Sequence, residues 1–398
     1  MNHDSGKLSR RRLWLLAAVL LVAACGGVDS GGTGTGNGPL APTLAVGAIA
    51  GFGSVIVNGV HYDDSQAAIA DDDGRSLDRA SLGLGMRTVV EASPIETVAG
   101  VPGAVAASIT VRSDIVGPVQ AVDMAHGVLT VLGQTVAVVP STFFGGTMAA
   151  GLSALQVGEV VEVHATPDAA TARFVASRIE GPVVGKPFKL RGPVASLSLA
   201  AKTVTIGAAV IAWSGVAPAD PAQSLAPGRM LRVVLDTVPA AGVWHATALR
   251  AASAVLDDRD RVELEGRVSA VRSAVDFDLD GIRVDASGAT VKGSGAGLVL
   301  GAKVEVKGSA RGGVLIAASV QIEDDEAASE VELQGSIVSV DAAQQRFVVR
   351  GVTVEWSGTT RFDSSTAQDI RAGKRVEVHG TLSADGTVVE ATSIHVES

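Results

Sequence analysis

Short stretches in which apolar and polar residues alternate recur along most of the chain. In AKVEVKG at 302–308, two valines alternate with glutamate and lysine, and near copies, KRVEVHG and GEVVEVH, stand at 374–380 and 158–164. Because successive side chains of a strand point to opposite faces, this pattern predicts β-strands with one buried face. Beyond the N-terminus, no window has the i, i+3, i+4 apolar spacing of a long amphipathic helix. The sequence therefore predicts an all-β protein.

The same order of predicted strands occurs five times, with a period of about 70 residues. Each unit opens with a strand that contains a glycine between apolar positions, namely Gly47, Gly117, Gly192, Gly266 and Gly335. Two strands joined by a tight glycine turn follow, as in a hairpin, at Gly59, Gly133, Gly207, Gly281 and Gly351. After a more polar stretch, a further glycine precedes the fourth strand, at Gly85, Gly158, Gly228, Gly301 and Gly373. A fifth strand begins at an alanine, namely Ala106, Ala176, Ala246, Ala317 and Ala391.

Five short strands with a longer insertion between the third and fourth predict an OB-like barrel. A small β-sandwich with the same number of strands is the alternative. The insertion is expected to hold a short helix, such as one or two turns in TAQDIRAG before Lys374. The first-strand glycine is expected to permit a sharp bend or bulge there.

The fold class predicted is thus a tandem array of five small five-stranded OB-like barrels. Modules 1 to 5 are expected at 44–112, 113–182, 186–253, 261–323 and 330–398. The segments that join them are short, for example VRSD at 111–114 and LDDRD at 256–260. We therefore expect the modules to follow one another as beads in a row, with the acidic linkers in solvent.

The first 24 residues have the order of features of a targeting segment. Basic residues precede an apolar run, Leu13–Ala24, which is too short to span a bilayer comfortably and ends at the only cysteine, Cys25. The stretch LVAAC resembles the lipobox of bacterial lipoproteins, which implies that Cys25 is diacylated and becomes the new N-terminus. An ordinary signal peptide with a chance cysteine is the alternative. Residues 25–43 are glycine-rich and are predicted to form a flexible tether.

The lipobox resemblance also implies a location. Gly26 follows the cysteine where an aspartate would resemble an inner-membrane retention signal, so an outer-membrane lipoprotein of the cell envelope is implied. The membrane would be a partner through the lipid anchor, with the modules in the periplasm or at the cell surface. SRRRLWL, Ser9–Leu15, faintly resembles a twin-arginine signal, so the general secretory and twin-arginine export routes stay open.

Several repeated phrases resemble those of a known family. They are GFGSVIVNGVHYDDS at Gly51–Ser65, the phrase around the fourth strand, and the closing strand that begins with alanine. They resemble a bacterial envelope family described only as a domain of unknown function, number 5666. The resemblance covers about 44–397 and is clearest in units one, four and five. It implies OB-like modules on secreted or lipid-anchored proteins, and it implies no reaction.

The charge balance argues against nucleic acid as a partner. Without the signal peptide, 28 basic residues stand against 41 acidic residues, which gives a net charge of about −13. An acidic surface repels phosphates, and single-stranded nucleic acid also needs aromatic platforms for stacking. Twelve aromatic residues remain for five modules, and Phe277 and Phe347 occupy matching positions that predict core packing.

Two acidic stretches contain the closely spaced carboxylates that a metal site needs. DFDLDG at Asp276–Gly281 resembles the opening of a calcium loop, but its twelfth position is Ser287 where glutamate is needed. Alternation predicts that its three aspartates lie on one solvated strand face. DDDG at Asp71–Gly74 reads as an exposed turn. We therefore expect no metal ion and no cofactor.

No motif predicts catalysis. GxSxG, HExxH and paired cysteines are absent, and His164 and His379 share the outward fourth-strand position of Lys307, which predicts a variable surface site. The sequence thus favours a protein that is not an enzyme and has a binding or spacer role towards an unknown envelope protein or glycan. One alternative is carbohydrate binding, with possible ligand stacking on Trp213, Trp244 and Trp356. A hydrolase assembled from distant residues is the other.

Overall fold

In a computed structural model of the protein, the described residues are 43–146, 148, 150–252, 256–293, 297–323, 330–363 and 365–397. Their secondary structure is almost entirely β, which confirms the predicted class. The predicted signal peptide, Cys25 and residues 25–42 of the tether lie outside the described residues. None of the described helices is long and apolar enough to cross a membrane.

Each module contributes five main strands, with one to three short extra elements. Module 1 contains β1 (Thr43–Phe52), β2 (Val55–Val57), β3 (Val60–Asp63), β4 (Ala68–Asp71), β5 (Arg87–Ala92), β6 (Glu96–Val98) and β7 (Val101–Arg112). Module 2 contains β8 (Ile115–Asp123), β9 (Val128–Val131), β10 (Gln134–Ala137), β11 (Phe143–Gly146), β12 (Val160–Asp168) and β13 (Arg173–Gly181). Module 3 contains β14 (Phe188–Ser198), β15 (Thr203–Ile206), β16 (Ala209–Ala212), the helix α1 (Pro221–Ser224), β17 (Met230–Leu235) and β18 (Trp244–Ala251).

The last two modules repeat this plan. Module 4 contains β19 (Arg259–Ser273), β20 (Asp276–Leu279), β21 (Ile282–Asp285), β22 (Thr290–Lys292), β23 (Lys303–Arg311) and β24 (Val314–Ile322). Module 5 contains β25 (Glu330–Asp341), β26 (Arg346–Val349), β27 (Val352–Glu355), β28 (Arg361–Phe362), β29 (Arg375–Leu382) and β30 (Val389–Val396). Short 3₁₀ turns lie at Arg79–Ser81, Gly151–Ala154 and Ala367–Asp369.

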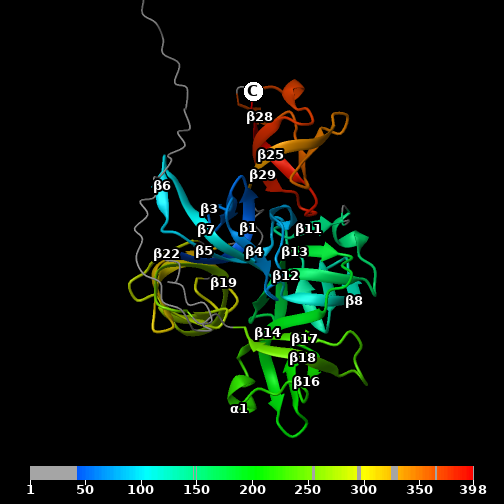
Figure 1. The fold of residues 1–398 in the computed structure, drawn as a ribbon, viewed down its shortest axis with the longest axis vertical. Coiled ribbons are helices and arrows are strands. Elements are labelled where there is room, and N and C mark those ends of the chain that lie inside the picture. Colours follow the sequence, from blue (N-terminus) through cyan, green and yellow to red (C-terminus); the bar gives the residue numbers. More distant parts are fainter. Residues whose placement is uncertain are drawn as a thin grey trace, which may run out of the picture. The chain divides into compact units, whose positions relative to one another are not determined.

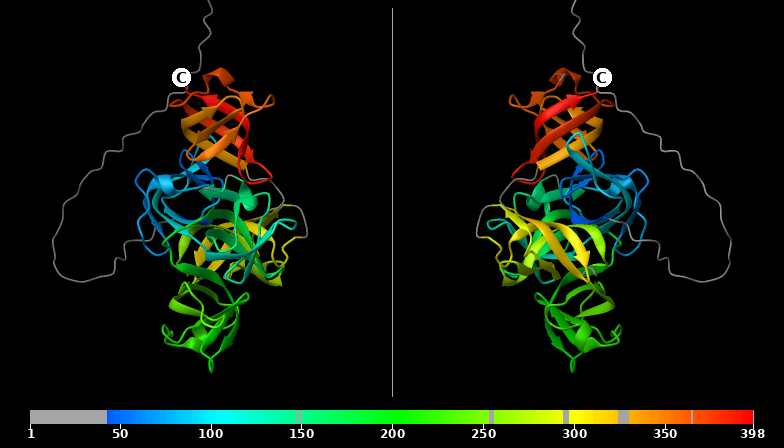
Figure 2. Two further views of the ribbon diagram at one scale, coloured as in Figure 1. Left: turned by 90° about the vertical axis from the view of Figure 1, so that its right-hand side faces the viewer. Right: turned by 90° about the vertical axis from the view of Figure 1, so that its left-hand side faces the viewer.

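The strand pairings close each module into a barrel. In module 4, β19 pairs with β20, β20 with β21, β21 in parallel with β24, β24 with β23, and β23 returns to β19. Module 5 has the same order, and its barrel is drawn in orange to red in Figure 2. Figure 1 shows the barrel around β19 nearly along its axis. This closed circuit is that of an OB-like barrel and excludes the sandwich alternative.

Period-two burial operates as predicted. Val306 of β23 and Val378 of β29 are fully buried, because alternate side chains of each strand point into the barrel. The hairpins also follow the predicted pattern. In module 2, for example, Leu132 and Gly133 both have positive φ, as a two-residue hairpin turn requires.

The first-strand glycines have a different purpose from the one expected. The bulge in each first strand lies two to four residues later, for example between Val119 and Ala121 in β8. The glycine instead allows the hairpin to approach closely. A Cβ at Gly117 would lie 2.4 Å from Cγ of Leu132, and a Cβ at Gly266 would lie 2.6 Å from Oδ2 of Asp280. Any larger residue would therefore collide with the turn of its own hairpin.

The insertion between the third and fourth strands contains a short strand that the sequence did not predict. In modules 1, 2, 4 and 5 this strand runs parallel to the fifth strand. The expected helical turn before Lys374 is present at Ala367–Asp369, where Thr366 and Asp369 form a capping box. Module 3 has α1 in its insertion, capped by Asp220.

The expectation of beads in a row is wrong, because strands of different modules pair with one another. β1 pairs in parallel with β19 at its start and with β25 at its end, and β8 pairs with β14. Modules 1, 4 and 5 thus share one sheet, and modules 2 and 3 share another. Each half of a first strand is paired on one side only within its own barrel, so the open edge is available to a neighbour. The linker VRSD is buried at Ser113 and Asp114, whereas the aspartates of the acidic linker at 256–260 are exposed, as predicted.

Candidate functional site

Three outward positions recur on each barrel, and in several modules they contact a neighbouring module. We call them the face triad: the residue three positions before the first-strand glycine, and the residues four and six positions after the glycine that precedes the fourth strand. The register places the first and last members opposite each other, as for Glu263 and Lys307 or Glu332 and His379. The triads of modules 1 to 5 are Leu44, Val89, Glu91; Asp114, Glu162, His164; Lys189, Arg232, Val234; Glu263, Glu305, Lys307; and Glu332, Glu377, His379.

The triad of module 3 is basic and binds the acidic turn of module 1. Asp72 contacts Lys189 at 3.2 Å and Arg232 at 2.8 Å, and it also contacts Arg191 at 2.9 Å. Asp73 pairs with the same lysine and with Arg232. Only 8% of the Asp72 side chain is exposed, so the prediction of an exposed turn at Asp71–Gly74 is wrong for Asp72, whereas Asp73 and Gly74 are exposed. The carboxylate of Asp72 faces cations of module 3 and is largely shielded from water.

The electrostatics of this contact favour charged aspartates. Burial alone would raise the pKa of Asp72, but Lys189, Arg232 and Arg191 together outweigh it and hold the pKa below its usual range. The pKa of Asp73 is lowered in the same way. Burial alone would raise this pKa, but the hydrogen bonds from Lys189 and Arg232 have the larger effect and lower it. We call this contact between modules 1 and 3 the aspartate lock.

The triad of module 2 is buried between modules. Asp114 lies 3.5 Å from Nε of Arg191 and 4.0 Å from Nε of Arg87, and Glu162 pairs with Lys186. His164 is fully buried, and its Nδ1 lies 2.6 Å from the carbonyl oxygen of Arg112. The prediction that His164 occupies a variable surface site is therefore wrong, since module 1 covers the outward face of this strand.

Asp280 has the same side-chain exposure as Asp278, 20%, but it contacts another module, which the prediction of a solvated face does not include. Its carboxylate lies 3.3 Å from the guanidinium of Arg87 in module 1, and its Oδ1 accepts a hydrogen bond from the backbone N–H of Arg267. Burial raises the pKa of Asp280, and Arg87 opposes that rise. The other two aspartates of DFDLDG behave as predicted. Asp276 and Asp278 are partly exposed on their strand and pair with nearby arginines.

Modules 1 and 4 dock their triads against each other. Leu44 and Val89 pack on the apolar core of module 4, and Glu91 forms an ion pair with Arg259 at 2.8 Å. In return, Nζ of Lys307 donates a hydrogen bond to the carbonyl oxygen of Asn58 at 3.3 Å. Within module 4, the same ammonium lies 2.9 Å from Glu305 and 3.9 Å from Glu263. Two acidic triad members therefore share a cation that the third member supplies.

The triad of module 5 is the most open of the acidic ones. Glu332, Glu377 and His379 have side-chain exposures of 30%, 39% and 49%. Nε2 of His379 lies 3.3 Å from Oε1 of Glu377, and Nε2 of His61 in module 1 lies 3.7 Å from Oε2 of Glu332. One ligand atom from each triad member lies within 4.8 Å of the others. This arrangement could hold a cation.

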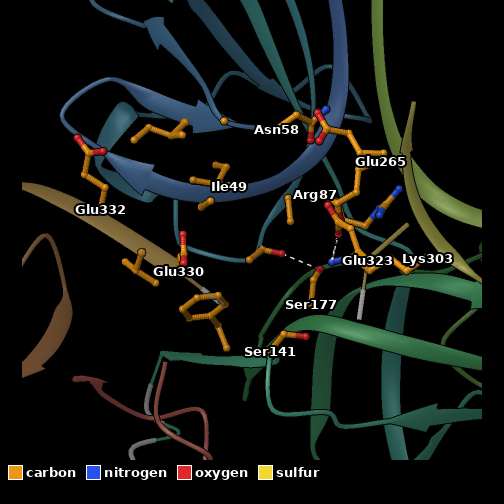
Figure 3. Close-up of a pocket in the computed structure, with 18 of the residues that line it drawn as sticks. Ile49, Asn58, Arg87, Ser141, Ser177, Glu265, Lys303, Glu323, Glu330 and Glu332 are labelled. Atoms are coloured by element: carbon orange, nitrogen blue, oxygen red, sulfur yellow. Dashed lines mark hydrogen bonds and ion pairs between the residues drawn. The ribbon is translucent and has the colours of Figure 1, made fainter. Parts of the chain in front are cut away.

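A cavity of about 740 Å³ lies where modules 1, 2, 4 and 5 meet, and its lining includes His61, Arg87, Ser177 and His379. Figure 3 shows Glu330 and Glu332 on one side of it, and Glu265, Glu323 and Lys303 on the other. The glutamates that line it are Glu265, Glu305, Glu323, Glu330 and Glu332. No motif could have revealed this cavity, because its residues come from four modules.

The tryptophans proposed for ligand stacking lie in the cores. Trp213, Trp244 and Trp356 are each less than 10% exposed. Trp244 makes an edge contact with Phe188 at 6.0 Å between ring centroids, and Trp356 lies 5.9 Å from Phe347. Because the three rings are buried, this placement does not support a sugar platform. The predicted core position of Phe277 and Phe347 is confirmed.

Comparisons with known proteins find a family model that matches three modules, and one solved structure of low similarity. No curated protein matches the chain. One solved structure, described as drosophila Unr CSD456, aligns over 77% of this chain and 99% of its own length, at 9% identity and a TM-score of 0.14. So low a score carries no argument.

Residues 116–180, 265–321 and 334–395 match the profile of a family described as Domain of unknown function (DUF5666). These segments lie in modules 2, 4 and 5. The sequence predicts that the likeness to this family is clearest in modules 1, 4 and 5. The match confirms this for modules 4 and 5. It includes module 2, and not module 1, as the third module. Three modules of the chain thus match the DUF5666 family model.

Proposed function

We propose that this protein is a non-catalytic, lipid-anchored protein of the cell envelope that binds a partner in the cavity between modules 1, 2, 4 and 5. The cavity is the observation that carries this proposal. Its volume of about 740 Å³ is within the range of sites that bind ligands, and such sites are usually preformed.

The contacts between modules support a binding role over a simple spacer. A spacer needs only modules in series, whereas here β1 joins β19 and β25, which are distant in sequence. Module 2 also reaches module 5, since the N–H of Phe144 donates to the carbonyl oxygen of Gly386 at 3.1 Å. These contacts hold together the four modules that surround the cavity, so the site does not have to form on binding.

The charges of the lining suggest the chemistry of the partner. Five glutamates line the cavity, against Arg87, Arg267 and Lys303 as permanent cations. Several of these charges already pair, for example Lys303 with Glu323 at 2.8 Å. Glu330 and Glu332 leave an acidic excess on one side, which favours a basic, polar segment of an envelope protein. The glycan alternative has no support from the buried tryptophans.

Crosslinking in living cells tests the binding role. A photoreactive amino acid is placed at Thr392, an exposed residue of the cavity lining, and a matched control is placed at Ala201, an exposed residue of module 3 away from the cavity. We expect a crosslinked envelope protein from position 392 only, and less of it when Glu330→Lys reverses one lining charge. Equal products at both positions, or none at position 392, would refute the role of the cavity.

The lipid anchor is tested separately. We expect Cys25→Ser to abolish incorporation of a labelled fatty acid and to release the protein from the membrane fraction, because each acyl chain contributes about 0.8 kcal/mol per buried methylene. A Cys25→Ser protein that still carries the label would refute the anchor while leaving the cavity proposal unaffected.

A further inference from the structure

The face triads of modules 4 and 5 differ at one informative position. Glu263 and Glu305 of module 4 correspond to Glu332 and Glu377 of module 5, and both pairs stand on equivalent strands in the same register. The third member is Lys307 in module 4 but His379 in module 5. A lysine carries a permanent positive charge, whereas a neutral imidazole offers a lone pair.

In module 4 the two carboxylates already have their cation. The ammonium of Lys307 lies 2.9 Å from Glu305 and 3.9 Å from Glu263. In module 2 the corresponding carboxylates, Asp114 and Glu162, also have cationic partners, from Arg191 and Lys186. Among the residues that the structure describes, Glu332 and Glu377 have ion-pair partners only in His61 and His379.

We infer that Glu332, Glu377 and His379, with His61 of module 1 as a fourth ligand, form a binding site for a divalent transition-metal ion, of which Zn²⁺ fits best. Two imidazoles and two carboxylates are a ligand set that suits Zn²⁺, while calcium and magnesium prefer oxygen alone. The ion would replace the lysine charge that module 5 lacks. This inference does not depend on whether the cavity binds a partner.

The strand geometry directs the three triad members to one place. Glu377 and His379 are two positions apart on β29 and therefore share a face. His379 is directly opposite Glu332 on β25. His61 comes from β3 of module 1, which is brought alongside by the pairing of β1 with β25 at Glu332.

Two of the ligand-atom separations are close to those that a tetrahedral ion requires. Zinc bonds of about 2.0–2.2 Å place neighbouring ligand atoms roughly 3.3–3.5 Å apart. The separations are 3.3 Å between His379 Nε2 and Glu377 Oε1, and 3.7 Å between His61 Nε2 and Glu332 Oε2. The triad atoms lie within 4.8 Å of one another, and their partly exposed side chains can rotate to close the remaining gap. Because the ligands come from modules 1 and 5, the ion would fasten these modules together.

Zinc titration of the purified full-length chain by calorimetry, after treatment with a chelator, tests the site. We expect one high-affinity ion per chain, and cobalt substituted for zinc should give the visible spectrum of a tetrahedral site. Glu332→Gln should weaken binding at least tenfold, and His61→Ala should weaken it by a smaller factor. His379→Lys recreates the arrangement of module 4 and should abolish binding while the protein stays folded.

His126→Ala is the matched control, because His126 is an exposed histidine that pairs with Asp123 at 2.7 Å outside the site. This variant should bind zinc as the unmodified chain does. Zinc binding that survives both His379→Lys and Glu332→Gln would place the ion elsewhere and overturn the inference. The inference would also be overturned if the unmodified chain bound zinc no more tightly than the His379→Lys variant does.

Discussion

The aspartate lock gives the most direct test of how the modules are held together. Removing Asp72 with Asp72→Ala leaves Lys189, Arg191 and Arg232, each less than 10% exposed, without their shared carboxylate. Breaking a buried ion pair from one side typically costs about 3–5 kcal/mol, because the remaining charges stay buried. Asp73 still pairs with two of the three cations, so we expect the lower end of this range, about 3 kcal/mol.

Hydrogen exchange during urea titration is the suitable assay, because a chain of five modules need not unfold in one step. The loss of stability should appear as faster exchange in peptides that contain β14 and β17, because these strands carry the three cations. Asp276→Ala is the control, since Asp276 pairs with exposed arginines on the surface of module 4 and should change nothing measurable. Equal effects of the two substitutions, or a loss spread evenly over all modules, would refute the reasoning.

Acid should weaken the same contact. The folded pKa values of Asp72 and Asp73 lie below the usual value of 3.8. The lock therefore contributes its full stability above the unfolded pKa and loses it as the pH falls through the lower folded values. Between pH 5 and pH 7 the protection factors of the amides in β14 and β17, which correct for the intrinsic pH dependence of exchange, should stay constant, and below about pH 3.8 they should fall. In Asp72→Asn, most of this acid dependence should disappear.

Two further substitutions test the barrel interior. Gly117→Ala should lower the free energy of unfolding by about 1–3 kcal/mol, because its Cβ would lie 2.4 Å from Leu132. Gly215→Ala is the control: its Cβ would enter open space, so the free energy of unfolding should change by no more than about 0.5 kcal/mol in the same thermal unfolding measurement. Trp356→Ala should cost about 3–5 kcal/mol, localised to module 5 by hydrogen exchange, because the indole is a core side chain. Unchanged stability together with lost glycan binding would instead support the stacking role of Trp356.

The barrels themselves could be predicted because their signals are local. Alternation at Val304 and Val306 is a property of one strand, and the repeat of glycine turns gives the order of strands in each unit. Buried valines in the fourth strands and hairpins at the expected glycines follow from these short-range patterns. The first-strand glycines were recognised, although the close approach of Leu132 to Gly117 needed coordinates.

The arrangement of the modules, and with it the candidate site, was decided by tertiary structure alone. A polar residue on an outward strand face has the same sequence pattern whether it meets water or the charges of another module. Asp72 and His164 therefore read as surface residues although they are buried between modules. The meeting of His61 with Glu332 depends on β1 pairing with β25, a contact between residues far apart in the chain. Local periodicity determines which face of a strand is buried in its own barrel, but only the packing of the barrels decides what covers the other face.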